Sequence, residues 1–127
     1  MTKKCFILTE GPTAKGPYSP AVEANGLVFV SGQGPFKEDG TLEQSSLEAE
    51  TRRVMDNLGG VLKAAGLGFK DVVKTTCYLA NIDDFARFNE VYKTYFPEEP
   101  PARTTIQAGR LPLGFNVEVE AIAVRPS

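Results

Sequence analysis

Residues 117–124, VEVEAIAV, carry an apolar side chain at every second position with two glutamates between them, and this pattern limits the possible folds more than any other segment. Because successive side chains of a β-strand point to opposite faces, the segment predicts a strand with one apolar face. That face comprises Val117, Val119, Ala121 and Ala123. The other face carries Glu118 and Glu120. Such a strand needs helices over its apolar side, so we expect a two-layer α+β architecture.

The preceding strand-like segment, ARTTIQA, places Arg103 and Thr105 on one face. We expect this to be the face that bears the two glutamates, away from the helices. A guanidinium presents paired donors that match a carboxylate, so Arg103 is a candidate anion-binding residue. Glu118 is a candidate base, with a pKa raised by its apolar flanks and lowered by Arg103. The alternative is a structural salt bridge from Arg103 to Glu118 or Glu120. The pattern alone decides neither between these readings nor which glutamate handles water.

Turn signals and apolar runs divide the rest of the chain into the order β-β-β-α-β-α-β-β. We expect strands at 4–9, on both sides of Asn25-Gly26, and at 72–80. Asn-Gly between apolar runs is the strongest short hairpin signal. The run from Leu27 to Val30 is apolar at every position, which predicts a strand buried on both faces. Residues 11–20, rich in Gly and Pro, predict a loop.

Two amphipathic helices are expected. The first begins at a capping box, with Ser45 as N-cap and Glu48 reaching back, and ends near residue 65. Its apolar stripe comprises Leu47, Val54, Leu58, Val61, Leu62 and Ala65. The second runs over about 84–96, after a cap at Asn81 or Asp83. Its stripe comprises Phe85, Phe88, Tyr92 and Phe96.

These elements favour one domain over residues 1–127, with one mixed sheet of six strands and both helices on one face. The opposite face then holds Leu27, Phe29, the two glutamates and Arg103. A monomer rarely leaves such groups open to water over a wide area. We therefore expect an oligomer with cavities between its subunits, each site being built from two chains.

Composition excludes several classes of function. A net charge of −2 argues against binding to nucleic acid. The chain has no histidine, which excludes Ser-His-Asp triads, Cys-His pairs and histidine zinc sites. Cys5 and Cys77 are too far apart for a metal motif or a disulfide framework and indicate a reducing compartment. The N-terminal segment lacks the apolar run of a signal peptide and no segment is long enough to span a bilayer, so we expect a cytoplasmic protein.

Three further positions carry polar groups of interest. Tyr18, in GPYSP, can offer a hydroxyl to a substrate, although such a tyrosine more often packs a loop. Ser31-Gly32 ends a predicted strand, where backbone N–H groups can bind an anion, although a simple glycine turn is the commoner case. Lys74 can in principle form a Schiff base, but a solvated lysine is the usual outcome.

Several segments together resemble the reactive-intermediate deaminase family, also called Rid or YjgF-like and, in older usage, endoribonuclease L-PSP. They are GPYSPAV, VFVSGQ, VVKTTCYLANIDDFARFNEVY, PPARTT and VEVEAIAV, and they cover nearly the whole chain in order. The resemblance implies a chorismate-mutase-like α+β fold and a homotrimer with clefts at the subunit interfaces. It also implies hydrolysis of reactive enamines and imines to 2-oxo acids and ammonia, without a metal or cofactor.

The same resemblance implies roles for seven positions. Arg103 matches the arginine that binds the substrate carboxylate, and Glu118 matches the residue that positions or activates water. The substrate-binding positions are Tyr18, Ser31, Gly32, Asn89 and Thr105. Many relatives read Arg-Ser-Cys where this chain reads Arg103-Thr104-Thr105, so Thr105 replaces a pocket thiol and the resemblance implies no thiol-dependent reactivity for this chain.

We expect a 2-iminobutanoate/2-iminopropanoate deaminase. Imine hydrolysis proceeds unaided and needs mainly positioning and proton transfer, so a site without histidine is sufficient. Two alternatives are an RNA-directed role, as endoribonuclease or translation inhibitor, and a non-catalytic binder of small carboxylates. The negative net charge and the missing histidine argue against the first. The second would use the same arginine but would not need Glu118.

Overall fold

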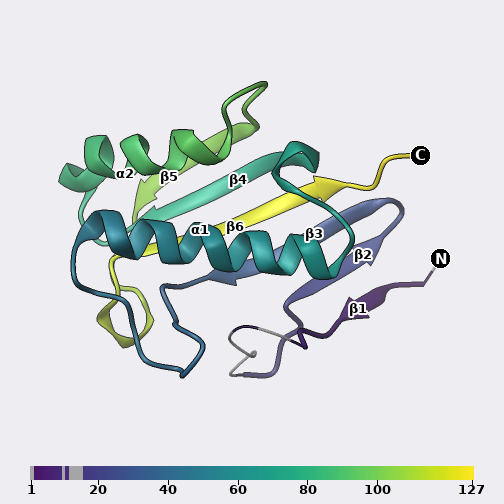
Figure 1. The fold of residues 1–127 in the computed structure, drawn as a ribbon, viewed down its shortest axis with the longest axis horizontal. Helices are drawn as coiled ribbons and strands as arrows, with labels where there is room; N and C mark the ends of the chain where they lie inside the picture. Colours follow the sequence, from purple (N-terminus) through teal and green to yellow (C-terminus); the bar gives the residue numbers. More distant parts are fainter. Residues whose placement is uncertain (1, 10, 12–15) are drawn as a thin grey trace.

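The computed structural model describes residues 2–9, 11 and 16–127. The strands are β1 (Lys4–Phe6), β2 (Ala21–Ala24), β3 (Leu27–Gln33), β4 (Val72–Leu79), β5 (Ala102–Gln107) and β6 (Val117–Val124), and the α-helices are α1 (Leu47–Ala64) and α2 (Phe85–Tyr92). The strands form one mixed sheet in the order β1-β2-β3-β6-β4-β5. Both helices lie over the same face of this sheet (Figure 1). The predicted six-stranded mixed sheet with two helices on one face is therefore confirmed.

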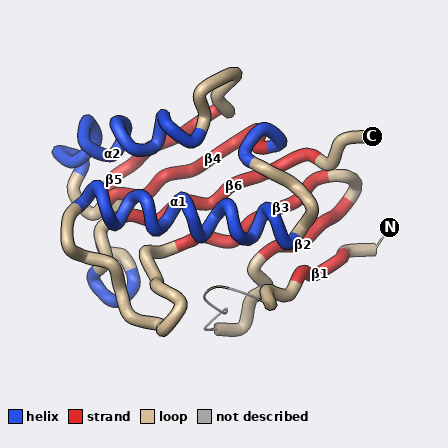
Figure 2. The backbone as a smooth tube through the Cα atoms, viewed as in Figure 1, coloured by secondary structure: helices blue, strands red, loops and turns tan. Residues whose placement is uncertain are grey.

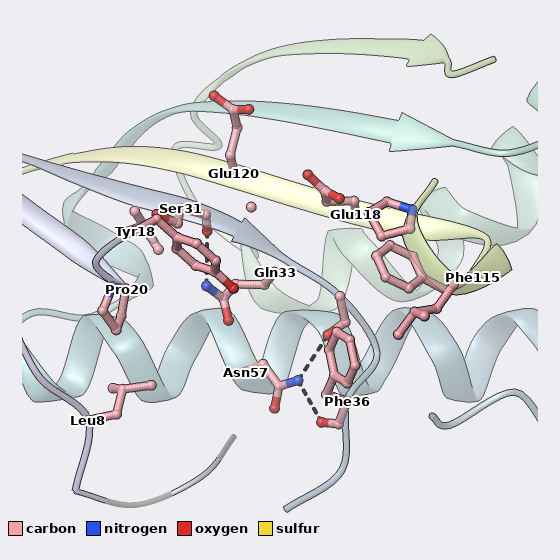
Figure 3. A pocket seen from close by; sticks show the side chains of 15 residues that line it. Leu8, Tyr18, Pro20, Ser31, Gln33, Phe36, Asn57, Phe115, Glu118 and Glu120 are labelled. Atoms are coloured by element: carbon pink, nitrogen blue, oxygen red, sulfur yellow. Dashed lines mark hydrogen bonds between the residues drawn. The ribbon is translucent and has the colours of Figure 1, made fainter. Parts of the chain in front are cut away.

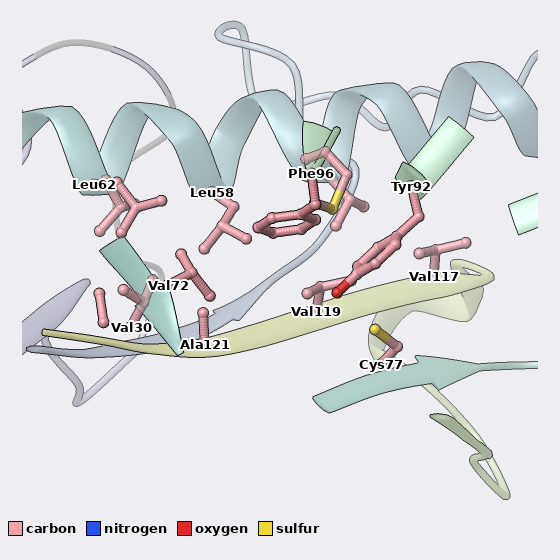
Figure 4. Packing of buried hydrophobic residues seen from close by; sticks show 14 of the residues in the cluster. Val30, Leu58, Leu62, Val72, Cys77, Tyr92, Phe96, Val117, Val119 and Ala121 are labelled. Carbon is pink, nitrogen blue, oxygen red and sulfur yellow. The ribbon is translucent and has the colours of Figure 1, made fainter. Parts of the chain in front are cut away.

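The apolar core fills the space between the helices and the covered face of the sheet (Figure 4). Strand β6 lies between β3 and β4, and its residues alternate between buried and half-buried as predicted. Its buried side chains are Val117, Val119, Ala121 and Ala123. All six predicted stripe residues of the first helix are also buried and belong to the same core. The period-two and period-3.6 patterns thus identify the two surfaces that meet.

The hairpin between β2 and β3 turns at Asn25 and Gly26, whose φ angles of 54° and 78° suit a turn with two left-handed residues. This confirms the predicted hairpin. The prediction that the next strand is buried on both faces is wrong for the single chain. Val28 and Val30 are buried, but Leu27 and Phe29 remain 36% and 43% exposed. Their side chains point to the face that the helices leave open.

Helix α1 begins one residue later than predicted. Ser46 is the N-cap, and its hydroxyl accepts a hydrogen bond of 3.0 Å from the backbone N–H of Ala49. The predicted N-cap, Ser45, instead donates to the carboxylate of Glu43 at 2.9 Å. Glu48 does not close a capping box, because its carboxylate forms an ion pair of 2.7 Å with Arg87. This ion pair joins the start of α1 to α2.

The other elements are shorter than predicted. The first strand covers residues 4–6, and α2 ends at Tyr92, where one turn of 3-10 helix continues the chain over Lys93–Tyr95 (Figure 2). Asn81 caps a 3-10 turn that precedes α2, by accepting from the N–H of Asp83. Residues 12–15 of the predicted loop lie outside the described residues. Three of the four predicted stripe residues of α2 are buried, whereas Phe85 is 37% exposed.

Candidate active site

The register of the sheet decides on which face Arg103 lies. In β6, Val119 faces the helices and pairs with Cys77 of β4, which in turn pairs with Thr105 of β5. Side chains of directly paired residues point to the same face. Thr105 and, two residues earlier, Arg103 therefore face the helices, whereas Glu118 pairs with Tyr78 on the open face. The prediction that Arg103 shares a face with the two glutamates is wrong, because a period of two relates residues within one strand but not between strands.

Arg103 is held by neutral groups from α2. Its Nη1 donates to the side-chain oxygen of Asn89 at 2.7 Å. Its guanidinium carbon lies 4.8 Å from the ring centroid of Tyr92 and 5.3 Å from that of Phe85. Among the described residues, no carboxylate forms an ion pair with it. The structural salt bridge to Glu118 or Glu120 is therefore absent within the described chain, and the cation keeps donors for an external anion.

Thr105 lies next to this cluster. Its hydroxyl oxygen is buried and has no hydrogen-bond partner among the residues that the structure describes. The neighbouring thiol of Cys77 is fully buried, and this burial raises the pKa of Cys77 to about 11. A thiol with that pKa stays protonated at neutral pH and is a weak nucleophile.

A cavity of about 650 Å³ opens at the end of β3 (Figure 3). Four of the predicted site residues line it, namely Tyr18, Ser31, Gly32 and Glu118. The other three, Asn89, Arg103 and Thr105, do not. In Figure 3, Glu118 and Glu120 project from β6 on the side away from α1, which carries Asn57 below the cavity. A single chain therefore presents the predicted residues as two separate groups.

A register shift between Val30 and Gln33 displaces Ser31 and Gly32 from regular pairing with β6. Ser31 is fully engaged with the loop before β2, since its backbone N–H donates to Pro20 at 2.9 Å and its hydroxyl donates to Ser19 at 2.6 Å. The expectation that the backbone N–H of Ser31 is free to bind an anion is therefore wrong. These bonds instead fix the segment that carries Tyr18.

Gly32 leaves room for the carboxylate of Glu118. A Cβ atom at position 32 would overlap that carboxylate, so any side chain there would force Glu118 to move. The start of β6 is also anchored: Glu50 of α1 is buried and accepts hydrogen bonds from the backbone N–H groups of Asn116 and Val117. The position of Glu118 is thus set from both sides.

The two glutamates of β6 differ in their surroundings. The hydroxyl of Tyr78 donates to Glu120 at 2.8 Å, so Glu120 is engaged. Glu118 accepts no hydrogen bond from the described residues. Burial, with a smaller contribution from the charge of Glu120, raises the pKa of Glu118 above its usual value. A carboxylate of raised pKa and free lone pairs suits proton transfer near neutral pH.

Sequence reasoning missed the apolar wall of the cavity. It includes Phe36 and Phe115, whose rings pack edge to face at 5.9 Å, and Leu113. Asn57 fixes this wall by donating to the carbonyls of Gly34 and Phe36 at 3.0 and 2.8 Å. Phe36, Leu113 and Phe115 lie outside the α-helices and strands, where the sequence has no periodic pattern. The aromatic partners of Arg103 were predicted only as core, although Phe85, Asn89 and Tyr92 have the spacing of one helix face.

Across the described residues, no group of three or more Asp, Glu or Cys is arranged to hold a metal ion. None of the described helices has the length and apolar composition needed to cross a bilayer.

The family model for endoribonuclease L-PSP matches residues 8–125. A mouse protein named 2-iminobutanoate/2-iminopropanoate deaminase is 45% identical over 124 residues, which cover 97% of this chain and 92% of the mouse protein. Reactive Intermediate Deaminase A, chloroplastic, from Arabidopsis thaliana is 47% identical over 123 residues, covering 95% of this chain and 66% of that protein. Among solved structures, E. coli TdcF with bound serine matches with a TM-score of 0.91 and 35% identity, over 97% of this chain and 99% of TdcF.

Proposed function

Because this chain belongs to the endoribonuclease L-PSP family, which was predicted as the reactive-intermediate deaminase family, we propose that it is a 2-iminobutanoate/2-iminopropanoate deaminase. The reaction adds water to a 2-imino acid and releases a 2-oxo acid and ammonia. The mouse relative carries this name over nearly its full length. The name of the TdcF structure records a bound amino acid, serine, which also carries a carboxylate.

The observation that carries this proposal is that no carboxylate of the described residues pairs with Arg103. Within the residues that the structure describes, its guanidinium is held by an amide and two aromatic rings, and it therefore remains available to a substrate carboxylate. In the proposed mechanism Arg103 binds the α-carboxylate, and Glu118 takes a proton from a water molecule that attacks the C=N carbon. Glu118 returns that proton to the nitrogen, which gives the neutral carbinolamine. The hydroxyl proton of the carbinolamine then moves to the nitrogen as the C=O bond forms and the C–N bond breaks, which releases the 2-oxo acid and ammonia. Tyr18, Ser31, Gly32, Asn89 and Thr105 shape the binding site.

We propose that two subunits of a homotrimer share each site. Arg103 faces the helices and Glu118 faces away from them, so one chain does not bring both to one substrate. A neighbouring subunit that covers the open sheet face would bring its Arg103 to the cavity beside Glu118. The half-exposed Leu27 and Phe29 on that face favour such a contact. The mass of the particle in solution, measured by light scattering, tests the trimer directly.

The first test of the activity is Arg103→Ala. Two charge-assisted hydrogen bonds to a carboxylate stabilise the complex by about 3–4 kcal/mol, so kcat/KM should fall several hundredfold. The assay follows 2-iminobutanoate that an amino-acid oxidase generates in place. Arg52→Ala, at an exposed position of α1, is the matched control. Full activity of Arg103→Ala, with the oligomer intact, would remove the proposal.

Two alternatives give different results. A carboxylate-binding protein without activity would tolerate Glu118→Gln, whereas the deaminase loses its turnover and keeps its affinity for 2-oxobutanoate. An RNA-directed protein, which the family's name suggests, would bind RNA with an affinity that falls steeply with salt. Deamination of a small substrate should depend on salt only weakly.

We further propose that residues 1–127 act as one domain in the cytoplasm. The compartment rests on the unpaired state of Cys5 and Cys77. The Arabidopsis relative is named chloroplastic, so family membership does not assign a compartment. Fractionation of cells that express the natural gene tests this location.

A further inference from the structure

We propose that Tyr92 and Phe85 are positioning residues, which hold the guanidinium of Arg103 in the orientation that receives the substrate carboxylate. This inference rests on the proposed function, because it concerns how the anion-binding group of that site is prepared. Neither ring needs to contact the substrate itself. Their effect passes through Arg103.

The first observation is the stacking geometry. The guanidinium carbon lies 4.8 Å from the centroid of Tyr92 and 5.3 Å from that of Phe85, both within the range of cation–π attraction. Phe85, Asn89 and Tyr92 are spaced four and three residues apart on α2, so one helix face supplies all three contacts. Nη1 of Arg103 uses Asn89, and its other N–H groups have no partner within the described residues.

The second observation is that Tyr92 is itself fixed. Its side chain reaches from α2 toward the sheet, with the hydroxyl at the end nearer the strands (Figure 4). This hydroxyl forms a hydrogen bond of 2.7 Å with Thr75, a residue of β4 with no exposed surface. Tyr92 is 6% exposed, and its burial raises the pKa of the hydroxyl. Thr75 pairs with Arg103 in the sheet, so the ring and the arginine share one anchor point on β4.

The third observation is that the three groups found to hold the guanidinium within the described part of the chain, Asn89, Phe85 and Tyr92, are all neutral. A carboxylate in place of Asn89 would neutralise Arg103 and compete with the substrate. The aromatic rings attract the cation without cancelling its charge. The cluster thus restricts the arginine side chain, whose free rotation would otherwise weaken binding, and keeps its charge available.

The substrate carboxylate does not change during hydrolysis. Interactions that improve its binding therefore stabilise ground state and transition state alike, and their loss raises KM while kcat stays nearly constant. Purely structural damage would instead lower the melting temperature and the fraction of active sites, without changing the affinity of the sites that remain.

The experiment measures the Kd of 2-oxobutanoate by calorimetry, together with KM and kcat for 2-iminobutanoate, on the full chain. Tyr92→Leu should raise Kd and KM about tenfold, and Phe85→Leu about threefold, with kcat within about twofold of the wild type. Tyr92→Phe keeps the ring and should restore most of the affinity. Val91→Ala is a buried change on the same helix, at a residue that is not among the three groups found to hold Arg103, and it should lower stability but leave Kd unchanged.

Asn89→Asp is the second variant, since it preserves shape and adds one charge. Pairing with Arg103 should raise the Kd of 2-oxobutanoate about a hundredfold. If Tyr92→Leu fails to fold, the exposed Phe85 and the isosteric change at Asn89 still test the inference. Wild-type affinity in Phe85→Leu and Asn89→Asp would overturn it. A wild-type protein that neither binds 2-oxobutanoate nor accelerates hydrolysis would instead overturn the proposed function.

Discussion

Two inactive variants should restore each other's activity when their subunits mix. Arg103→Ala removes the anion-binding group and Glu118→Gln removes the base. These side chains face opposite sides of one sheet, so the proposed site takes one of them from each of two subunits. A mixed oligomer then contains some sites that have both natural residues.

The recovered activity follows from counting. In an equal mixture, half of the subunits carry the natural arginine and half carry the natural glutamate, and each site draws the two residues from different subunits. About one quarter of the sites are therefore intact, and the mixture should recover about one quarter of the wild-type rate. Mixed particles isolated through two different affinity tags should recover about one third of the wild-type rate. In a cyclic trimer that contains both variants, a single interface has both natural residues, whichever variant is in excess.

The assay compares hydrolysis of 2-iminobutanoate by each variant alone, by the co-expressed mixture and by the doubly purified particles. Each variant alone serves as the control for residual activity. A mixture that stays as inactive as its components would refute the shared site, because it would mean that both residues act from one chain. A doubly purified particle with about half of the wild-type rate would indicate a dimer in place of a trimer.

Four further tests each address a single feature. Gly32→Ala should lower kcat/KM at least tenfold, because the new methyl group displaces the carboxylate of Glu118. The control Gly68→Ala, at a position with open space around it, should leave kcat/KM unchanged. A wild-type rate in Gly32→Ala would contradict the contact between Gly32 and Glu118. Glu118 acts as a base only when ionised, so the rate should fall as the pH drops through its raised pKa. Glu120→Gln removes a neighbouring negative charge and should lower the pKa of Glu118, which moves the acidic limb of the pH–rate profile to lower pH. A limb that does not move would exclude the charge coupling between the two glutamates. Burial that raises the pKa of Glu118 also means that its ionised form lowers the stability of the folded protein at pH values above that pKa. Glu118→Gln removes this charge and should therefore raise the melting temperature at pH 7. Cys77 is buried and has a pKa of about 11, so it should resist alkylation at pH 8 while the exposed Cys5 of β1 reacts. Mass spectrometry should find one modified thiol per folded chain. A second modified thiol would show that the core opens.

Local patterns predict the layers of this fold because they report local geometry. The alternation in β6 identifies the covered face of the sheet, and Asn25-Gly26 identifies the hairpin, since both depend on neighbours in sequence. The cap of α1 was misplaced by one residue because Ser45 and Ser46 both carry suitable hydroxyls. Only the backbone conformation selects Ser46.

The candidate site was harder to predict, because its geometry depends on contacts between distant segments. The sequence correctly predicts which neighbours share a face with Arg103 in β5 and with Glu118 in β6. Whether the two residues lie on the same face of the sheet depends on how both strands pair with β4. The aromatic stripe of α2 was read as core, whereas Tyr92 serves both core and site. The cavity wall at Phe36 and Phe115 comes from loops, for which sequence periodicity carries no information.

The contact between Gly32 and Glu118 has an evolutionary consequence. Because a side chain at position 32 would displace the carboxylate of Glu118, the two positions should change together among descendants of this gene. A lineage that acquires alanine at 32 should first shorten residue 118 to aspartate or abandon the carboxylate. Either path moves or removes the proton acceptor, so such lineages should be those in which the ancestral chemistry has been lost.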